Sequence, residues 1–410
     1  MIGIKKLSEI LKLDLDYFVR GGFWLTFSAV LSALAGIILS SLFARLWPRD
    51  VYGQFSFLIF AVGFLSITTL PGMVEAVFQG SIENKDGVFR KAIKKVVLWS
   101  CLGAGALIFG SFYFFVRDNS NLAIAVFLAA LAFPFSTLSS LIIAFYNGKK
   151  QFKKSSLISV VANLFSVAFT ALALIKFGGL IQVTLFSMWS TAIVNIFLTL
   201  KALSEIKSFS EDKKLIKLGM FLSFSQFIWL SLDYLDKLLI PLFLGYEKFA
   251  VYTFAILIPL QIQNFFKSFV ILGQPKIADI ADENVKRVLI SKSLLFESVI
   301  FSIVLVYIIL CPFIYRILYP GYEESVLLSQ LFALSLLYYP SNLFGSYLVK
   351  KRVIKGSMIV TIIYFVSSTL TLLIFLHFWG LIGAILSKIF SRIIQIIITQ
   401  FIFLREVKTK

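Results

Sequence analysis

The sequence predicts an all-α integral membrane protein, with about twelve transmembrane helices in two six-helix lobes related by a pseudo-two-fold axis along the membrane normal. Three observations support this fold class: long apolar spans, alternating basic content in the segments between them, and an internal repeat. Of the 410 residues, 59% are hydrophobic, and the mean hydropathy is +0.92. Little polar sequence therefore remains for a soluble domain.

Twelve apolar spans are each long enough to cross a bilayer, because roughly 20 helical residues at ~1.5 Å rise cover the ~30 Å hydrocarbon layer. They cover approximately 22–44, 54–78, 96–116, 121–146, 156–175, 178–200, 218–243, 249–272, 293–315, 325–348, 357–376 and 379–403.

The short segments between the spans alternate between rich and poor in lysine and arginine. One set, which includes both termini, holds 29 basic residues, and the other holds 6. This positive-inside pattern predicts that both termini lie in the cytoplasm and that the chain lies in the cytoplasmic membrane. It also explains the net charge of +18, so membrane lipids are expected partners and nucleic acid is not.

An internal repeat relates the two halves of the chain. Residues 18–46 match 215–243 at an offset of 197, and Lys176–Ser190 match His377–Ser391 at an offset of 201, with six of fifteen positions identical. The repeat predicts lobes at 1–205 and 206–410. Because each lobe has an even number of helices, both enter the membrane from the same side, as in transporters whose lobes rock about a central cleft.

Four basic residues fall inside the spans, where an ionised side chain costs roughly 2.5 to 3.5 kcal/mol. They are Lys237, Lys267, Lys388 and Arg392. Such charges normally face a bundle interior or water, so each is a candidate binding residue.

Lys388 and Arg392 lie four residues apart on the last span, and therefore on one face of a helix. Their repeat partners, Ser187 and Thr191, are uncharged, so the repeat does not require the two cations. One interpretation is a cationic stripe that binds phosphate, with Arg392 bidentate and Lys388 as a point charge. The alternative is that both side chains extend to the cytoplasmic interface. The position of Lys388, about nine residues from the start of the span, favours the first interpretation.

The seventh span carries Asp233, Asp236 and Lys237. The four-residue step from Asp233 to Lys237 allows an intrahelical ion pair, which would lower the cost of burial. The third charge makes the group acidic and leaves one carboxylate to bind a proton, a sodium ion or Lys267. We therefore treat Asp233 and Asp236 as candidate ion-coupling residues, and Glu75, which follows Pro71-Gly72, as a third.

The stretch from Arg20 to Phe78 contains a motif that resembles a known family. It has a glycine-rich start, a long first span, an acidic residue before the second span and a break late in that span. The residues are Gly21-Gly22, Ala44-Arg45-Leu46, Asp50, Tyr52-Gly53 and Pro71-Gly72. This pattern resembles the Wzx-like polysaccharide-export flippases of the multidrug/oligosaccharidyl-lipid/polysaccharide flippase superfamily. The second half departs from it, because the counterpart of Tyr52-Gly53 is Tyr252-Thr253.

The resemblance implies that a lipid-linked oligosaccharide, carried on a polyprenyl phosphate or pyrophosphate, moves from the inner to the outer face of the membrane. It implies a hydrophilic, cationic central cavity, and a glycan polymerase or chain-length machinery as partner. Together with the charges within the spans, it gives Lys388, Arg392, Lys267, Lys237 and Arg45 as the expected substrate-binding residues. For Arg45 the resemblance favours a structural or gating role, and an interfacial anchor fits it equally well.

The main competing interpretation is a proton- or sodium-coupled multidrug or cation antiporter of the same superfamily, which would favour an acidic cavity. An enzyme is not expected, because the outer loops are short and no GxxxxGK motif followed by Ser or Thr occurs. Cys101 and Cys311 have no metal-ligand spacing, and neither a metal nor a cofactor is expected. A scaffold for glycan-assembly enzymes is a third reading, disfavoured by the charges within the spans.

Overall fold

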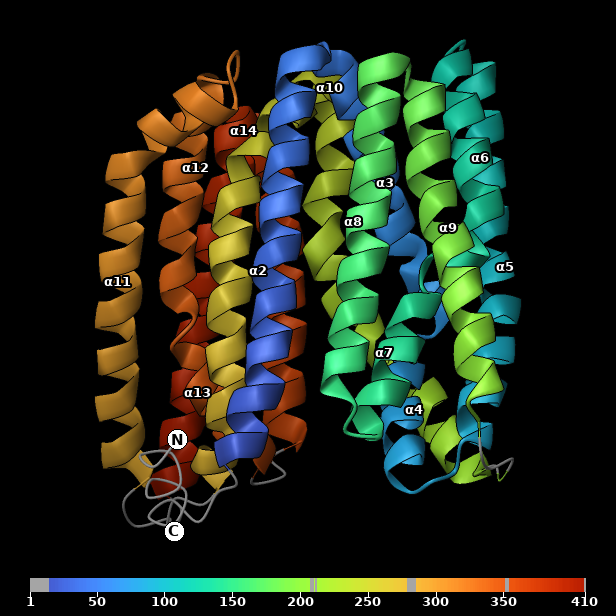
Figure 1. Cartoon of the computed structure of the whole chain (residues 1–410). Helices are drawn as coiled ribbons and strands as arrows, with labels where there is room; N and C mark the ends of the chain where they lie inside the picture. The colour runs from blue at the N-terminus through green and yellow to red at the C-terminus, as the bar shows by residue number, and fades with distance from the viewer. Residues whose placement is uncertain (1–14, 207–209, 211, 279–284, 351–353, 409–410) are drawn as a thin grey trace. The chain divides into compact units, whose positions relative to one another are not determined.

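A computed structural model describes residues 15–206, 210, 212–278, 285–350 and 354–408 of the chain (Figure 1). Side chains are described for 27–206, 210, 212–264, 266, 286–345, 347–348 and 359–405. Every regular element in these ranges is helical. The all-α prediction is confirmed.

The elements are, in order, α2 (Leu15–Leu46), α3 (Arg49–Leu65), η1 (Ser66–Thr69), α4 (Met73–Ile82), α5 (Gly87–Val116), α6 (Ser120–Ser136), α7 (Leu138–Gly148), α8 (Phe152–Lys176), α9 (Leu180–Ser204), α10 (Lys213–Ala278), α11 (Val285–Leu318), α12 (Glu324–Leu334), η3 (Ser335–Tyr338), α13 (Ser341–Lys350) and α14 (Ile354–Lys408).

Ten segments of the described chain are long and apolar enough to cross a membrane, so the protein is a multi-pass membrane protein. Two of them, in α10 and α14, have 52 and 47 residues, about twice what one crossing needs. Each contains one glycine outside helical geometry, Gly245 (φ 81°) and Gly380 (φ 56°). Glycine tolerates this left-handed region because it has no Cβ. The predicted number of twelve is reached only if each long segment is counted as two crossings.

The chain forms two compact units. Unit 1 contains the described residues up to Leu46 together with Leu58–Leu230, and unit 2 contains Trp47–Phe57 and Ser231–Lys410. The first part of α3 therefore groups with unit 2, and the part of α10 before Ser231 groups with unit 1. The lobe boundaries at 1–205 and 206–410 stay a prediction.

Unit 1 is a helical bundle in which α5 packs on α6, α6 on α9, and α8 on both α9 and α2. Its described hydrophobic core joins α4, α5 and α7 to the first turns of α10. Phe89 and Phe145 stack there with ring centroids 4.6 Å apart. Met73 and Ala76 of α4 are fully buried in the same core.

Ion pairs join residues in and beside the basic connecting segments of unit 1. Lys149 Nζ lies 2.8 Å from Asp86, and Lys154 Nζ lies 2.5 Å from Glu205. Lys85 Nζ lies 2.8 Å from Asp212, and its hydrogen bond holds the pKa of that carboxyl below its usual range. Glu205 at the end of α9 and Asp212 just before α10 are thus both held by ion pairs within unit 1.

The Tyr52-Gly53 motif packs inside unit 2. Tyr52 is buried and stacks on Phe254, with ring centroids 4.6 Å apart. A Cβ on Gly53 would collide with the backbone of Tyr246. The motif therefore has a packing role, because only glycine allows the two backbones to approach this closely.

A second close approach occurs in unit 1, between α4 and the start of α10. Gly72 N donates a hydrogen bond to Ser223 Oγ at 3.0 Å. A Cβ on Gly219 would lie 2.9 Å from both Ala76 Cβ and Met73 Sδ. Gly219 is therefore required by packing.

Replacing Gly219 by alanine should destabilise the protein by about 1–3 kcal/mol, because overpacking forces neighbouring groups to move. The measurement is the thermal unfolding midpoint of the purified protein in detergent. Gly105→Ala is the control, since a Cβ at Gly105 meets nothing within 4 Å. Equal midpoints for the two variants would contradict this explanation of Gly219.

Candidate functional site

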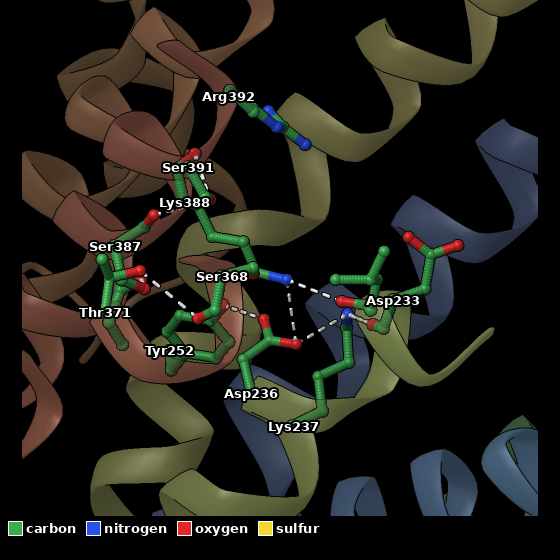
Figure 2. Close-up of polar contacts among 12 residues, drawn as sticks. Asp233, Asp236, Lys237, Tyr252, Ser368, Thr371, Ser387, Lys388, Ser391 and Arg392 are labelled. Atoms are coloured by element: carbon green, nitrogen blue, oxygen red, sulfur yellow. Dashed lines mark hydrogen bonds and ion pairs between the residues drawn. The ribbon is translucent and has the colours of Figure 1, made fainter. Parts of the chain in front are cut away.

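Four charged residues of unit 2 lie close to one another on two helical segments, the part of α10 after Ser231 and the part of α14 after Gly380. They are Asp236, Lys237, Lys388 and Arg392, here called the charged cluster (Figure 2). Their exposed fractions are 1%, 8%, 9% and 7%. Buried charges of this kind are rare and mark functional sites in membrane proteins.

Asp236 is the anion of the charged cluster. Lys388 Nζ lies 3.3 Å from its Oδ1 atom, and Lys237 Nζ lies 3.6 Å from the same atom. The hydroxyl of Tyr252 donates a hydrogen bond to the other oxygen, Oδ2. The carboxylate is therefore held by two ammonium groups and one phenol from three positions in the sequence.

Backbone carbonyls of α10 complete the environment of the two lysines. Lys388 Nζ donates to the carbonyl of Leu232 at 3.0 Å, and Lys237 Nζ donates to the carbonyl of Asp233. Figure 2 shows Lys388 reaching from α14 to these α10 groups. Each ammonium group thus shares the Asp236 carboxylate and has its own carbonyl acceptor.

Arg392 lies one turn further along α14 and has different partners. Its guanidinium donates to the carbonyl of Ser335 at 3.1 Å, to the Ser335 hydroxyl, and to Gln263 Oε1 at 3.4 Å. The ring of Tyr338 lies below it, 4.5 Å from Cζ to the centroid. No ion pair joins Arg392 to a carboxylate among the side chains that the structure describes, and its buried Nε atom has no hydrogen-bond partner there.

The charged cluster therefore contains three cationic side chains and one carboxylate, a formal excess of two positive charges. Removing charges from water is costly unless opposite charges offset them. Arg392, which lacks a carboxylate partner among the described side chains, carries one of the two excess charges, and the two lysines that share Asp236 carry the other. Such an environment suits an anionic ligand.

Only some of the predicted site residues lie together in the structure. It brings together Lys388, Lys237 and Asp236, with Arg392 nearby, whereas Asp233 is exposed and its carboxylate is directed away from Asp236 (Figure 2). The sequence allowed an intrahelical ion pair between Lys237 and Asp233. In the structure Lys237 pairs with its neighbour Asp236, and its hydrogen bond to Asp233 goes to the backbone carbonyl. The side chain of Lys267 lies outside the described residues.

Arg45 and Glu75 belong to unit 1 and are exposed. Glu75 accepts a hydrogen bond from Gln79 Nε2 at 2.7 Å, one turn along α4. Neither residue is part of the charged cluster, and their proposed roles stay predictions.

Sequence reasoning missed three partners of the charged cluster, namely Tyr252, Gln263 and Ser335. Tyr252 was visible only as the repeat counterpart of Tyr52. Ser335 lies at a break in the helical path, where α12 gives way to η3. Pro340, five residues further on, is a signal for such a break.

The corresponding positions of unit 1 are uncharged. Thr191 Oγ1 donates to Ser166 Oγ at 2.9 Å, and Ser187 Oγ donates to the carbonyl of Thr184 at 3.1 Å. Asn195 Nδ2 donates to the carbonyls of Phe135 and Ser136, at 3.0 and 2.8 Å, beside the break between α6 and α7. In both units a side chain of a later helix, α9 or α14, thus donates to carbonyls at a helix break, but only in unit 2 is that side chain a cation.

No group of three His, Cys, Asp or Glu side chains that could hold a metal ion occurs among the described residues.

Comparison with known proteins decides the family. The sequence model of a family described as polysaccharide biosynthesis protein matches residues 18–272, well over half of the chain. The chain belongs to this family. The resemblance seen in the sequence from Arg20 to Phe78 is thereby confirmed. No curated protein sequence matches the chain.

Solved structures with the same fold are transporters of the MOP superfamily, to which the sequence resemblance also pointed. The polysaccharide biosynthesis family member is similar to the lipid II flippase MurJ in its inward closed conformation, with a TM-score of 0.68, 15% identity, and 93% of this chain and 87% of that chain covered. It is similar to an inward-facing multidrug resistance MATE family transporter, with a TM-score of 0.66, 11% identity, and 92% and 95% covered.

A third similar structure is a MOP superfamily transporter from Pyrococcus furiosus, described as having a binding pocket of reverse polarity. The TM-score is 0.63 and the identity 13%, with 96% of this chain and 95% of that chain covered. At these identities the likeness establishes the fold.

Within this family member, Asp236 and Lys388 should stabilise each other. Asp236→Asn leaves two buried lysines without an anion, and Lys388→Met removes one cation, so each single change should lower the unfolding midpoint. The double variant should lose less than the sum, with a coupling of about 1–3 kcal/mol. A double-mutant cycle in thermal unfolding measures this, and strictly additive effects would show that the pair contributes nothing.

Proposed function

We propose that the protein is a flippase that moves a polyprenyl phosphate- or pyrophosphate-linked oligosaccharide from the inner to the outer face of the cytoplasmic membrane, by alternating access, for surface polysaccharide biosynthesis. The observation that carries this proposal is the buried charged cluster, with its excess of two positive charges and its uncompensated Arg392. Membership of the polysaccharide biosynthesis family supports it.

The chemistry of the cluster fits a phosphate or pyrophosphate group. A guanidinium can hold two phosphate oxygens through parallel N–H donors, and an ammonium group adds an undirected positive charge. Aromatic rings beside Arg392, such as Tyr338, offer flat surfaces of the kind that stack on sugar rings. A headgroup that combines an anion with sugars would use both.

A drug or cation antiporter fits this site less well. A cationic substrate would meet net positive charge, and Asp236 is already held by two ammonium groups. The described pocket of the Pyrococcus furiosus transporter indicates that binding-site polarity differs among proteins of this fold. We therefore favour the anionic lipid.

The proposed orientation follows from the sequence. The connecting segments with 29 basic residues, including both termini, face the cytoplasm, and those with 6 face outward. A glycan polymerase or chain-length machinery would receive the translocated product.

Arg392→Gln should lower translocation at least about tenfold, because a hydrogen bond to a charged group contributes about 1.5–3 kcal/mol and every 1.4 kcal/mol is tenfold. The assay uses proteoliposomes with a short-sugar polyprenyl pyrophosphate, scoring its accessibility to an external sugar-modifying reagent. Arg287→Gln, at an exposed arginine of unit 2, is the control. Unchanged translocation in Arg392→Gln would remove this residue from the site.

Proton coupling is the second part of the proposal. Of the three candidate carboxylates, only Asp236 is buried, so its titration would change the charge balance inside the membrane. The stimulation of translocation by a pH gradient should therefore be lost in Asp236→Asn and kept in Asp233→Asn and Glu75→Gln. The measured quantity is the ratio of rates with and without the gradient, and an unaltered ratio in Asp236→Asn would reject coupling there.

A further inference from the structure

The two lysines of the charged cluster already have an anion, and Arg392 does not. Lys388 and Lys237 both approach one oxygen of Asp236, at 3.3 and 3.6 Å. Arg392 instead contacts a carbonyl, a hydroxyl, an amide oxygen and an aromatic ring. A phosphate bound by the full cluster would therefore meet one available cation and two that are engaged elsewhere.

Asp236 holds the position that a ligand oxygen would need. Its Oδ1 atom receives both ion pairs, while Oδ2 is fixed by the Tyr252 hydroxyl. The carboxylate belongs to α10 and cannot leave with the ligand. In contrast, a lysine has a flexible four-carbon stem and can turn its ammonium group from one anion to another.

We propose that Asp236 is a resident counter-anion, which competes with the ligand phosphate for Lys388 and Lys237, so that loading is an exchange of ion pairs. This inference rests on the proposed function. The phosphate first meets Arg392, and then Lys388 and Lys237 turn from Asp236 to the phosphate oxygens. Asp236 keeps its hydrogen bond from Tyr252.

The exchange limits affinity and favours release. Moving the lysines to a ligand leaves the Asp236 carboxylate buried with one hydrogen-bond donor, which costs free energy and offsets part of the binding gain. A neutral headgroup cannot meet that cost, because it offers the lysines no charge in return. Asp236 therefore acts as a specificity determinant for anionic headgroups and prevents the ligand from being held too tightly for transport.

Asp236→Asn should tighten binding of an anionic probe, because both lysines then lack a competing charge. The probe is a short-chain prenyl pyrophosphate, titrated against the full-length protein in nanodiscs. We expect a dissociation constant about tenfold lower than that of the wild type, and slower translocation. Asp233→Asn, three residues away with an exposed side chain, is the matched control and should stay within about twofold. Equal or weaker binding by Asp236→Asn would overturn the exchange.

Arg392→Gln separates this inference from the proposed function. If the wild type binds no probe, or if Arg392→Gln binds it as well as the wild type does, the proposed anionic ligand fails, and the exchange fails with it. If Arg392→Gln weakens binding and Asp236→Asn does not tighten it, the proposed function stands and only the exchange is overturned.

Tyr252→Phe decides the question if Asp236→Asn does not fold. Losing the phenol hydroxyl removes the hydrogen bond that Asp236 Oδ2 keeps when the lysines turn to the ligand. The exchange then costs more free energy, so the probe should bind about threefold more weakly. Tyr307→Phe, at another buried tyrosine of unit 2 with a hydroxyl partner in Ser329, is the control. No difference between the two tyrosine variants would overturn the exchange.

Discussion

Burying ionised groups inside a membrane protein is the constraint on which the rest of this structure depends. An apolar bundle tolerates Asp236, Lys237 and Lys388 because each ammonium group meets both the carboxylate and a backbone carbonyl. Tyr252 supplies the last donor. Arg392 is tolerated differently, through a helix break that exposes the Ser335 carbonyl and through the aromatic ring of Tyr338.

The two units share a plan and differ in charge. In unit 1, Asn195 contacts carbonyls beside the break between α6 and α7; in unit 2, Arg392 contacts the carbonyl at the start of η3. Ser187 in the repeat corresponds to Lys388. A neutral amide and hydroxyls satisfy the backbone as well as the cations do, so the backbone alone does not explain the charges of unit 2. The anionic ligand that we propose would explain them.

Much of the fold was predictable because apolar length and loop charge are local properties of the sequence. The pairing of Lys388 with Arg392 on one helix face followed from their spacing. The choice between Asp233 and Asp236 did not, because residues three apart lie close together on one helix surface, and which of them is buried depends on Lys388 of α14, far along the chain. The grouping of Trp47–Phe57 with unit 2 was likewise hidden, since it depends on packing against Phe254 and Tyr246.

The connections opposite the basic segments are very short. Leu46 is separated from Arg49 by two residues, Leu318 from Glu324 by five, and the two halves of α10 and of α14 meet directly at Gly245 and Gly380. Segments of this length cannot fold over a bulky sugar as a lid. In the flippase that we propose, selection among glycans would therefore depend on helix side chains within the bilayer.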